Sequence, residues 1–221
     1  MKKKFKNNRN ICCIGAGYVG GPTMSMIAYK CPEIIINVVD INKQRIDLWN
    51  STDLTKLPIY EPGLPEILSM VRNKNLFFSN NVKGAISKAD IIFLSVNTPT
   101  KIKGIGKGKA SNLGYLENSV REIAKYSKGH TIIVEKSTVP VKTAETIKLL
   151  LSSSFSDDLN NPPNTYSVIS NPEFLSEGSA IRDLEKPDRV LIGGEDKNAV
   201  EKIKELYSNW VPNEKIITTN L

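Results

Sequence analysis

The amino-acid sequence predicts an α/β fold in which a mostly parallel sheet is covered by helices on both faces. Two observations support this prediction. Short apolar runs rich in isoleucine and valine are continuous rather than alternating, as in strands that are buried on both faces. Segments with helical periodicity separate these runs, and regular alternation of strand and helix is typical of a doubly wound parallel sheet.

The elements follow one another along the chain in that alternating order. The expected strands are residues 11–14, 34–39, 91–96, 131–134, 166–169 and 190–192. A helix is expected to open at the glycines after the first strand, and further helices are expected at residues 43–49, 64–71, 116–126, 141–151 and 197–210. Polar stretches containing glycine or proline predict loops at residues 51–63, 97–114 and 152–164. Because long loops are usually functional or disordered, we expect function for the first two and disorder for the third.

The net charge of +7 is concentrated in two places. Residues 1–9 carry five positive charges without a balancing acid, and residues 101–109 carry four more, so the rest of the chain has a net charge of −2. A basic tail and one basic loop on a nearly neutral body do not resemble a nucleic-acid groove. No apolar stretch approaches the roughly 20 residues that a membrane-spanning helix needs. We therefore expect a soluble, cytoplasmic protein that binds neither nucleic acid nor membrane.

The cysteines and the single histidine do not indicate a metal site or a catalytic triad. Cys12 and Cys13 lie within an apolar run, and together with Cys31 they lack metal-ligand spacing. We expect all three to be reduced core thiols. His130 is the only histidine, and no catalytic role is assigned to it.

The glycine-rich segment after the first strand predicts a dinucleotide site. Gly15, Gly17 and Gly20 follow the strand and open a helix. In this fingerprint the first glycine permits a tight turn, the second lets the backbone approach a pyrophosphate, and the third lets the helix pack on the strand. Asp40 ends the next strand, about 20 residues beyond the glycines, where the fingerprint places an acid that binds the adenine ribose. A glycine turn of another α/β protein and a simple helix cap at Asp40 remain the structural alternatives.

Three further polar, proline-containing segments follow later strands. They are residues 97–100, 135–140 and 170–178. Because ligands of open α/β sheets bind outside the carboxyl ends of the strands, we expect these segments to line one cleft with the glycine loop. Ordinary turns and helix caps would also explain each segment singly.

Six motifs together resemble the family of UDP-glucose 6-dehydrogenases, particularly those of animals and plants. The motifs are IGAGYVGG (14–21), LPIYEPGL (57–64), SVNTPT (95–100), EKSTVPV (135–141), SNPEFLSEG (170–178) and PDRVLIGG (187–194). The resemblance implies a Rossmann-like NAD-binding domain at residues 10–221, preceded by the basic tail at residues 1–9. It also implies a truncated chain, without the central helix and the UDP-sugar domain.

The resemblance further implies NAD-dependent oxidation of UDP-glucose to UDP-glucuronate, in two steps that consume two NAD⁺. It assigns catalytic roles to Glu173, as the acid/base in thioester hydrolysis, and to Thr138, which helps to hold the water. The implied NAD-binding residues are Gly15, Ala16, Gly17, Tyr18, Val19, Gly20, Asp40, Arg45, Val96, Asn97, Thr98, Pro99, Thr100, Ser137, Thr138 and Glu177. The implied sugar-nucleotide residues are Glu173, Phe174, Leu175, Ser176 and Glu177. General acid/base catalysis favours a carboxylate whose pKa is raised in a closed cleft.

What the chain lacks also follows from the resemblance. The family's nucleophilic cysteine, its catalytic lysine and most uridine contacts would lie beyond residue 221, so we expect this chain to be inactive alone. The full-length form is expected to be a homo-oligomer. Three alternatives remain open: another nucleotide-sugar dehydrogenase, such as a GDP-mannose dehydrogenase, a non-catalytic NAD-binding module, and a nucleic-acid binder. The GKGKA loop at residues 106–110 and the LPIYEPGL segment argue against the first, and the acids of SNPEFLSEG argue against the second.

Overall fold

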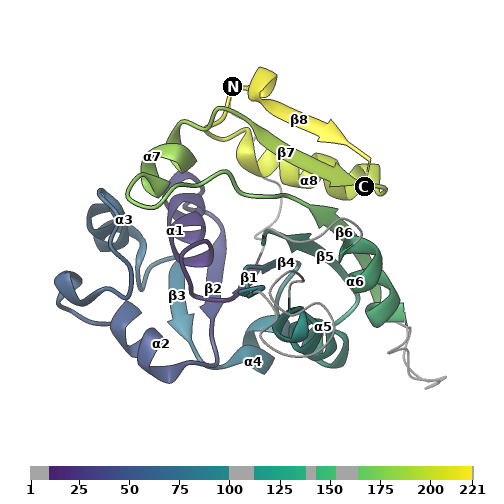
Figure 1. Cartoon of the computed structure of the whole chain (residues 1–221), viewed down its shortest axis with the longest axis horizontal. Helices are drawn as coiled ribbons and strands as arrows, with labels where there is room; N and C mark the ends of the chain where they lie inside the picture. Colours follow the sequence, from purple (N-terminus) through teal and green to yellow (C-terminus); the bar gives the residue numbers. More distant parts are fainter. Residues whose placement is uncertain (1–9, 100–111, 138–142, 153–163, 221) are drawn as a thin grey trace.

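A computed structural model describes residues 10–99, 112–137, 143–152 and 164–220 of the chain. Eight strands in this part form one sheet with the order β3-β2-β1-β4-β5-β6-β7-β8 (Figure 1). Neighbouring strands pair in parallel, with the exception of β6 and β7, which pair antiparallel. The predicted doubly wound, mostly parallel sheet is confirmed.

The chain alternates between strand and helix over most of its length. The strands are β1 (Asn10–Ile14), β2 (Ile35–Val39), β3 (Leu76–Ser79), β4 (Ile91–Leu94), β5 (His130–Glu135), β6 (Thr165–Ser170), β7 (Val190–Gly194) and β8 (Ile216–Thr219). The α-helices are α1 (Gly20–Lys30), α2 (Lys43–Trp49), α3 (Leu64–Val71), α4 (Val82–Ile86), α5 (Gly114–Tyr126), α6 (Thr143–Ser152), α7 (Ala180–Glu185) and α8 (Lys197–Tyr207). Two short 3₁₀ turns, η1 (Leu54–Lys56) and η2 (Asn213–Lys215), complete the described elements.

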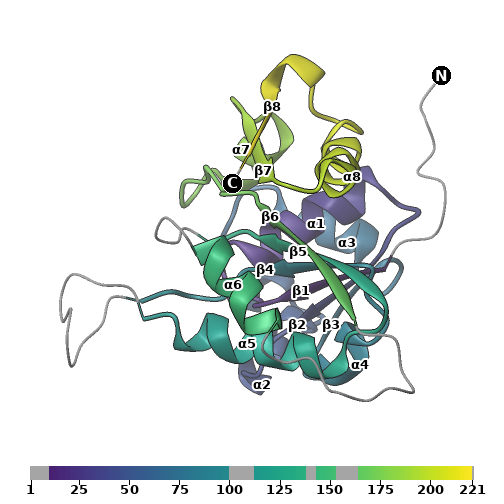
Figure 2. The same cartoon turned by 90° about the vertical axis from the view of Figure 1, so that its right-hand side faces the viewer.

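The sheet separates two hydrophobic cores, one on each face. One core contains apolar side chains of α1, α3, α7 and α8 together with Trp49 of α2, and the other contains those of α4, α5 and α6. Strands β7 and β8 and helix α8 lie at one end of the molecule, beyond β6 (Figure 2). Burial on both faces explains why the central strands are continuous apolar runs in the sequence.

The order of the strands places a ligand-binding crevice at the carboxyl ends of β1 and β4. The chain moves outward from β1 to β2 and β3, and then returns to the other side of β1 to form β4. The connections after β1 and β4 therefore lead to opposite faces of the sheet. They leave a crevice between the carboxyl ends of these two strands, where the strand order reverses direction. The glycine loop and residues 95–99 begin there.

Several elements differ from the prediction. β3, α4 and α7 were not predicted, and β8 is not among the six strands expected above. β4 ends at Leu94 rather than residue 96, and α8 ends at Tyr207 rather than residue 210, because Ser208 takes the C-cap position. Helix α5 begins at Gly114, two residues before the expected start. Residues 141 and 142, the expected start of α6, lie outside the described residues.

The helices of the described part include none that is long and apolar enough to cross a membrane.

Candidate functional site

The glycine loop between β1 and α1 has the backbone geometry that the sequence predicts. Gly15 adopts a φ of +109°, and a Cβ atom there would overlap the carbonyl of Ser95. A Cβ atom at Gly20 would overlap the carbonyl of Gly15. At Gly17 the nearest atom to such a Cβ is Oδ1 of Asn97, 4.0 Å away, so the space in front of this glycine is open. Gly15 and Gly20 are thus required by the fold, whereas Gly17 leaves room for a ligand.

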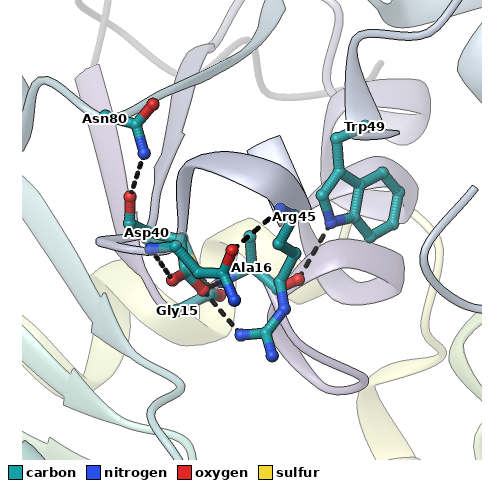
Figure 3. A network of polar contacts seen from close by, with 8 residues as sticks. Gly15, Ala16, Asp40, Arg45, Trp49 and Asn80 are labelled. Atoms are coloured by element: carbon teal, nitrogen blue, oxygen red, sulfur yellow. Dashed lines mark hydrogen bonds and ion pairs between the residues drawn. The ribbon is translucent and has the colours of Figure 1, made fainter. Parts of the chain in front are cut away.

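Asp40 is a buried acid that braces this loop (Figure 3). Its Oδ2 accepts a hydrogen bond from the backbone N–H of Ala16 at 3.0 Å, and it lies 3.0 Å from a guanidinium nitrogen of Arg45. Its Oδ1 accepts the backbone N–H of Asn42 at 2.8 Å. The cap at the start of α2 comes from Asn42, whose side chain accepts from the N–H of Arg45. Asp40 therefore also stabilises the loop, and it is not the N-cap of α2.

Trp49 holds the same loop from the other side. Its indole N–H donates to the carbonyl of Ala16 at 2.9 Å (Figure 3). Its ring stacks on Phe78 with centroids 4.6 Å apart. The Trp49 ring also lies where a side chain at Gly21 would be. Trp49 was not among the predicted site residues. The helical periodicity of residues 43–49 is the signal that could have identified its side chain as buried.

A cavity of about 490 Å³ opens beside the glycine loop. It brings together segments that are far apart in the sequence, and its volume is within the range of small-molecule sites. The predicted cofactor residues that line it are Gly15, Gly17, Asp40, Arg45, Val96, Asn97 and Pro99. Ile41 and Tyr115 add apolar surface.

The other predicted cofactor residues have different positions. Ala16 is buried beneath the loop, Val19 is the N-cap of α1, and Thr98 is half-buried between two lining residues. Ser137 is buried behind the wall, where its hydroxyl donates to the carbonyl of Val96 at 2.8 Å. Glu177 is exposed in a turn and lines neither cavity. Thr100 and Thr138 lie outside the described residues.

A second cavity, of about 430 Å³, lies between the β6–α7 segment and α8. Four of the predicted sugar-nucleotide residues line it, namely Glu173, Phe174, Leu175 and Ser176. The fifth, Glu177, follows them in the exposed turn. Four basic side chains also line this cavity: Lys136, Arg182, Lys186 and Arg189. Sequence reasoning assigned none of these four, because their convergence depends on the positions of α7 and β7.

The segment from residue 171 to residue 178 is anchored at its start. Asn171 is fully buried; its N–H donates to the carbonyl of Glu135 at 2.8 Å, and its side-chain amide donates to the carbonyl of Leu191 at 2.7 Å. Its Oδ1 accepts from the hydroxyl of Tyr207 at 2.7 Å. Further along, the guanidinium of Arg189 lies 4.6 Å from the centroid of the Phe174 ring, which is a cation–π distance.

Glu135, the last residue of β5, and the adjacent Lys136 are buried beside the second cavity, and both have shifted pKa values. Burial, assisted by the charge of Glu173, raises the pKa of Glu135 to about 8. Burial lowers the pKa of Lys136 to about 8, against the opposing effects of Glu173 and Glu135. The ammonium of Lys136 lies 5.9 Å from the centroid of the Tyr207 ring. Such perturbed groups in a cleft are typical of functional sites, and the EKS sequence alone did not indicate them.

Tyr18 links the glycine loop to the 171–178 segment. Its hydroxyl donates to the carbonyl of Ser176 at 3.2 Å and accepts the N–H of Gly178 at 3.1 Å. A residue of the glycine loop is therefore hydrogen-bonded to the segment that lines the second cavity. The loops were expected to line one cleft, but the structure divides them between two cavities. Gly15, Gly17 and residues 95–97 and 99 line the first, and Lys136 and residues 171–176 line the second.

The three cysteines are buried and form no disulfide, as predicted. Burial raises the pKa of Cys13 and Cys31 to about 12 and that of Cys12 well above its usual value. Thiols in this state are poor nucleophiles. In the described residues no group of three or more histidine, cysteine or acidic side chains is arranged to hold a metal.

Comparison with known proteins gives consistent matches. Residues 9–211 match the model of the NAD-binding domain of the UDP-glucose/GDP-mannose dehydrogenase family. UDP-glucose 6-dehydrogenase 5 of Oryza sativa subsp. japonica is 58% identical over 215 residues, which are 96% of this chain and 43% of that protein. UDP-glucose 6-dehydrogenase of Bos taurus is 55% identical over 217 residues, which are 96% of this chain and 42% of that protein. The chain spans less than half the length of these curated relatives.

Solved structures show the same fold. A UDP-glucose dehydrogenase from the archaeon Pyrobaculum islandicum matches 100% of this chain and 48% of its own, with a TM-score of 0.80 and 26% sequence identity. A GDP-mannose dehydrogenase from Pseudomonas aeruginosa, solved as a ternary complex, matches 95% of this chain and 46% of its own, with a TM-score of 0.79 and 29% identity.

Proposed function

Because this chain belongs to the UDP-glucose/GDP-mannose dehydrogenase family, we propose that it is the NAD-binding part of a UDP-glucose 6-dehydrogenase. The complete enzyme would oxidise the C6 alcohol of UDP-glucose to the carboxylate of UDP-glucuronate. The observation that carries the proposal is the presence of two cavities, one beside the glycine loop and one lined by residues 171–176, with Tyr18 of the loop hydrogen-bonded to Ser176 and Gly178.

The first cavity fits NAD. The open space at Gly17 admits a pyrophosphate, and the positive end of the α1 dipole favours it there. Asp40 and Arg45 would hold the adenine ribose, with Ile41 as an exposed apolar surface for the adenine. Val96, Asn97, Thr98 and Pro99 would flank the nicotinamide side, together with Thr100, Ser137, Thr138 and Glu177. Bound NAD⁺ would supply the hydride acceptor for oxidation at C6 of the sugar.

The second cavity fits the sugar nucleotide. Its four basic side chains stand beside three acids, Glu173, Asp183 and Asp188. The basic side chains suit a diphosphate, since ammonium and guanidinium groups pair well with phosphate oxygens. Glu173 lines the cavity near Glu135 and Lys136 and would act as the acid/base, with Thr138 assisting. Proton transfer within this group is favoured because the pKa values of Glu135 and Lys136 both lie near 8.

The names of the most similar curated relatives support UDP-glucose as the substrate of the complete enzyme. The curated relatives with 58% and 55% identity are UDP-glucose 6-dehydrogenases, whereas the GDP-mannose dehydrogenase of known structure is 29% identical. A non-catalytic NAD-binding module would not need the acids and cations of the second cavity. These observations support a dehydrogenase role over a sensing role.

The remainder of a longer polypeptide would supply the missing parts. We propose that it holds the central helix and UDP-sugar domain, and that the full-length form is a cytoplasmic homo-oligomer. The curated relatives, more than twice as long as this chain, support the first statement. Three buried thiols without a disulfide suit a reducing compartment.

Titration with NADH, followed by NADH fluorescence, tests this proposal directly. We expect saturable binding by the 221-residue chain, and UDP-glucose added separately should change the thermal unfolding midpoint. If NADH produced no signal while an oligonucleotide produced a salt-sensitive shift, the chain would be a nucleic-acid binder instead.

A further inference from the structure

Glu61 is a buried acid that neither cavity uses. It belongs to the LPIYEPGL motif, and only 2% of its surface is exposed, although its neighbour Tyr60 is 85% exposed. Burial of an unpaired carboxylate is costly, so a buried acid needs hydrogen-bond donors. Glu61 obtains them from a distant part of the chain.

Both carboxylate oxygens of Glu61 accept backbone N–H groups from the start of α7. Oε1 accepts the N–H of Gly178 at 2.7 Å, and Oε2 accepts the N–H of Ala180 at 2.9 Å. The same Gly178 N–H contacts the hydroxyl of Tyr18. Hydrogen bonds to an ionised acceptor are about twice as strong as bonds between neutral groups.

The LPIYEPGL segment is built to direct this carboxylate inward. The N–H of Leu64 donates to the carbonyl of Glu61 at 3.1 Å, and Gly63 adopts a φ of +85° at the N-cap of α3. A Cβ atom at Gly63 would lie 3.2 Å from Cγ2 of Ile181, so α7 packs closely over this turn. Leu57 and Ile59 pack against the core on the same side.

We propose that Glu61 is the positioning residue of the sugar-nucleotide side of the site, an inference that rests on the proposed function. Asn171 anchors the start of the 171–178 segment, and Glu61 anchors its end. Between these two anchors the segment presents Glu173 and Ser176 to the second cavity. The conformation of the segment therefore depends on an acid more than 100 residues away in the sequence.

The role requires a carboxylate rather than an amide. Both N–H groups point at acceptor atoms, whereas a glutamine would place one NH₂ group against an N–H group. Glu61→Gln therefore loses one hydrogen bond and leaves the other with a weaker, neutral acceptor, without changing the shape of the side chain. Glu61→Asp keeps two acceptors on a shorter stem and gives a second variant with a smaller defect.

Amide hydrogen exchange, measured by NMR on the whole chain, tests the proposal. In Glu61→Gln we expect exchange of Gly178 and Ala180 to accelerate by about tenfold or more, while exchange in β1 and β4 remains unchanged. Glu61→Asp should show a smaller acceleration at the same two amides. Glu66→Gln, which alters an exposed acid of α3, is the matched control and should change neither.

Two outcomes would overturn the proposal. Unchanged exchange at Gly178 and Ala180 in Glu61→Gln would show that the carboxylate does not hold the segment, and equal acceleration in β1 and β4 would show a role in global stability only. A parallel NADH titration separates this result from the proposed function. Saturable NADH binding should persist in Glu61→Gln, because Glu61 lines neither cavity. A chain that binds no NADH before any substitution would instead contradict the proposed function.

Discussion

The guanidinium of Arg45 lies 3.0 Å from Oδ2 of Asp40, the same oxygen that accepts the N–H of Ala16. Oδ2 therefore already receives two donors, and Oδ1 receives the N–H of Asn42. A carboxylate offers about four acceptor positions, so one remains while Arg45 is in place. Binding of both ribose hydroxyls requires Arg45 to leave Asp40, and its partial exposure permits this. The released guanidinium is suited to stack on adenine.

Cofactor choice should follow from Asp40. Its carboxylate accepts hydrogen bonds from the ribose of NADH but repels the 2′-phosphate of NADPH, so the unmodified chain should prefer NADH strongly. We expect Asp40→Ser to weaken NADH binding by about tenfold or more, since a hydrogen bond to a charged group contributes about 1.5–3 kcal/mol. The difference between the affinities for NADH and NADPH should become smaller, because Arg45 becomes free to bind the 2′-phosphate. Fluorescence titrations with both cofactors measure these constants.

Asp47→Ser is the matched control for this substitution. Asp47 is an exposed acid of α2 that pairs with Lys43, and its loss should leave both affinities unchanged. Equal affinity of the unmodified chain for NADH and NADPH would show that Asp40 does not have the assigned role.

Gly15 and Gly17 should respond differently to alanine. At Gly15 the positive φ and the overlap with Ser95 predict that Gly15→Ala lowers the free energy of unfolding by at least about 1 kcal/mol. At Gly17 the space is open, so Gly17→Ala should keep the unfolding midpoint and weaken NADH binding by on the order of tenfold, or about 1.4 kcal/mol. Thermal unfolding and NADH titration of both variants check this. Unchanged NADH affinity in Gly17→Ala would place the pyrophosphate elsewhere.

The fold could be predicted from the sequence where the periodicity was strong. Helices α2 and α3 have the predicted bounds, because their apolar residues recur at helical spacing, Asn42 caps α2, and a proline stands in the first turn of α3. β3, α4 and α7 are only four to six residues long, too short for a periodic signal. Their formation depends on tertiary contacts, such as the stacking of Trp49 on Phe78 of β3.

The candidate site was predictable where a motif fixes the backbone. Gly15, Gly17 and Asp40 meet at one cavity because the turn and the parallel pairing of β1 with β2 determine their positions. Glu61, Trp49, Glu135 and Arg189 could not be assigned in this way. Each acts through contacts between segments distant in sequence, and no local spacing encodes such contacts.

The 221-residue chain should not catalyse the reaction alone. Its three thiols are buried, and the pKa values of Cys13 and Cys31 rise to about 12, so none is a nucleophile near neutral pH. We expect no NADH absorbance from UDP-glucose and NAD⁺, and slow reaction of the native thiols with iodoacetamide. The urea-unfolded chain is the control, and its thiols should react quickly. Measurable NADH production would contradict this prediction.

The stability of the chain should pass through a minimum near pH 8 because of Glu135 and Lys136. Burial raises the pKa of Glu135 from its usual value of 4.5 to about 8, so between these pH values the folded state binds the proton that the unfolded state has lost. The free energy of unfolding then falls as pH rises, by up to about 1.4 kcal/mol per pH unit. Burial lowers the pKa of Lys136 from 10.5 to about 8, so above pH 8 the unfolded state binds more protons and stability rises again.

Single substitutions separate the two contributions to this minimum. Glu135→Gln keeps a neutral side chain of the same shape, so its free energy of unfolding should not fall with pH below pH 8. The difference in free energy of unfolding between this variant and the unmodified chain should therefore grow as pH rises to 8. Lys136→Met, which keeps the apolar stem without the ammonium, should remove the rise above pH 8. Urea unfolding across the range provides the measurement, and Glu177→Gln, at an exposed acid of the 171–178 segment, is the control with an unchanged profile. If the curves of Glu135→Gln and the unmodified chain ran parallel, Glu135 would be ionised in the folded state at neutral pH and could not take part in proton transfer beside Glu173.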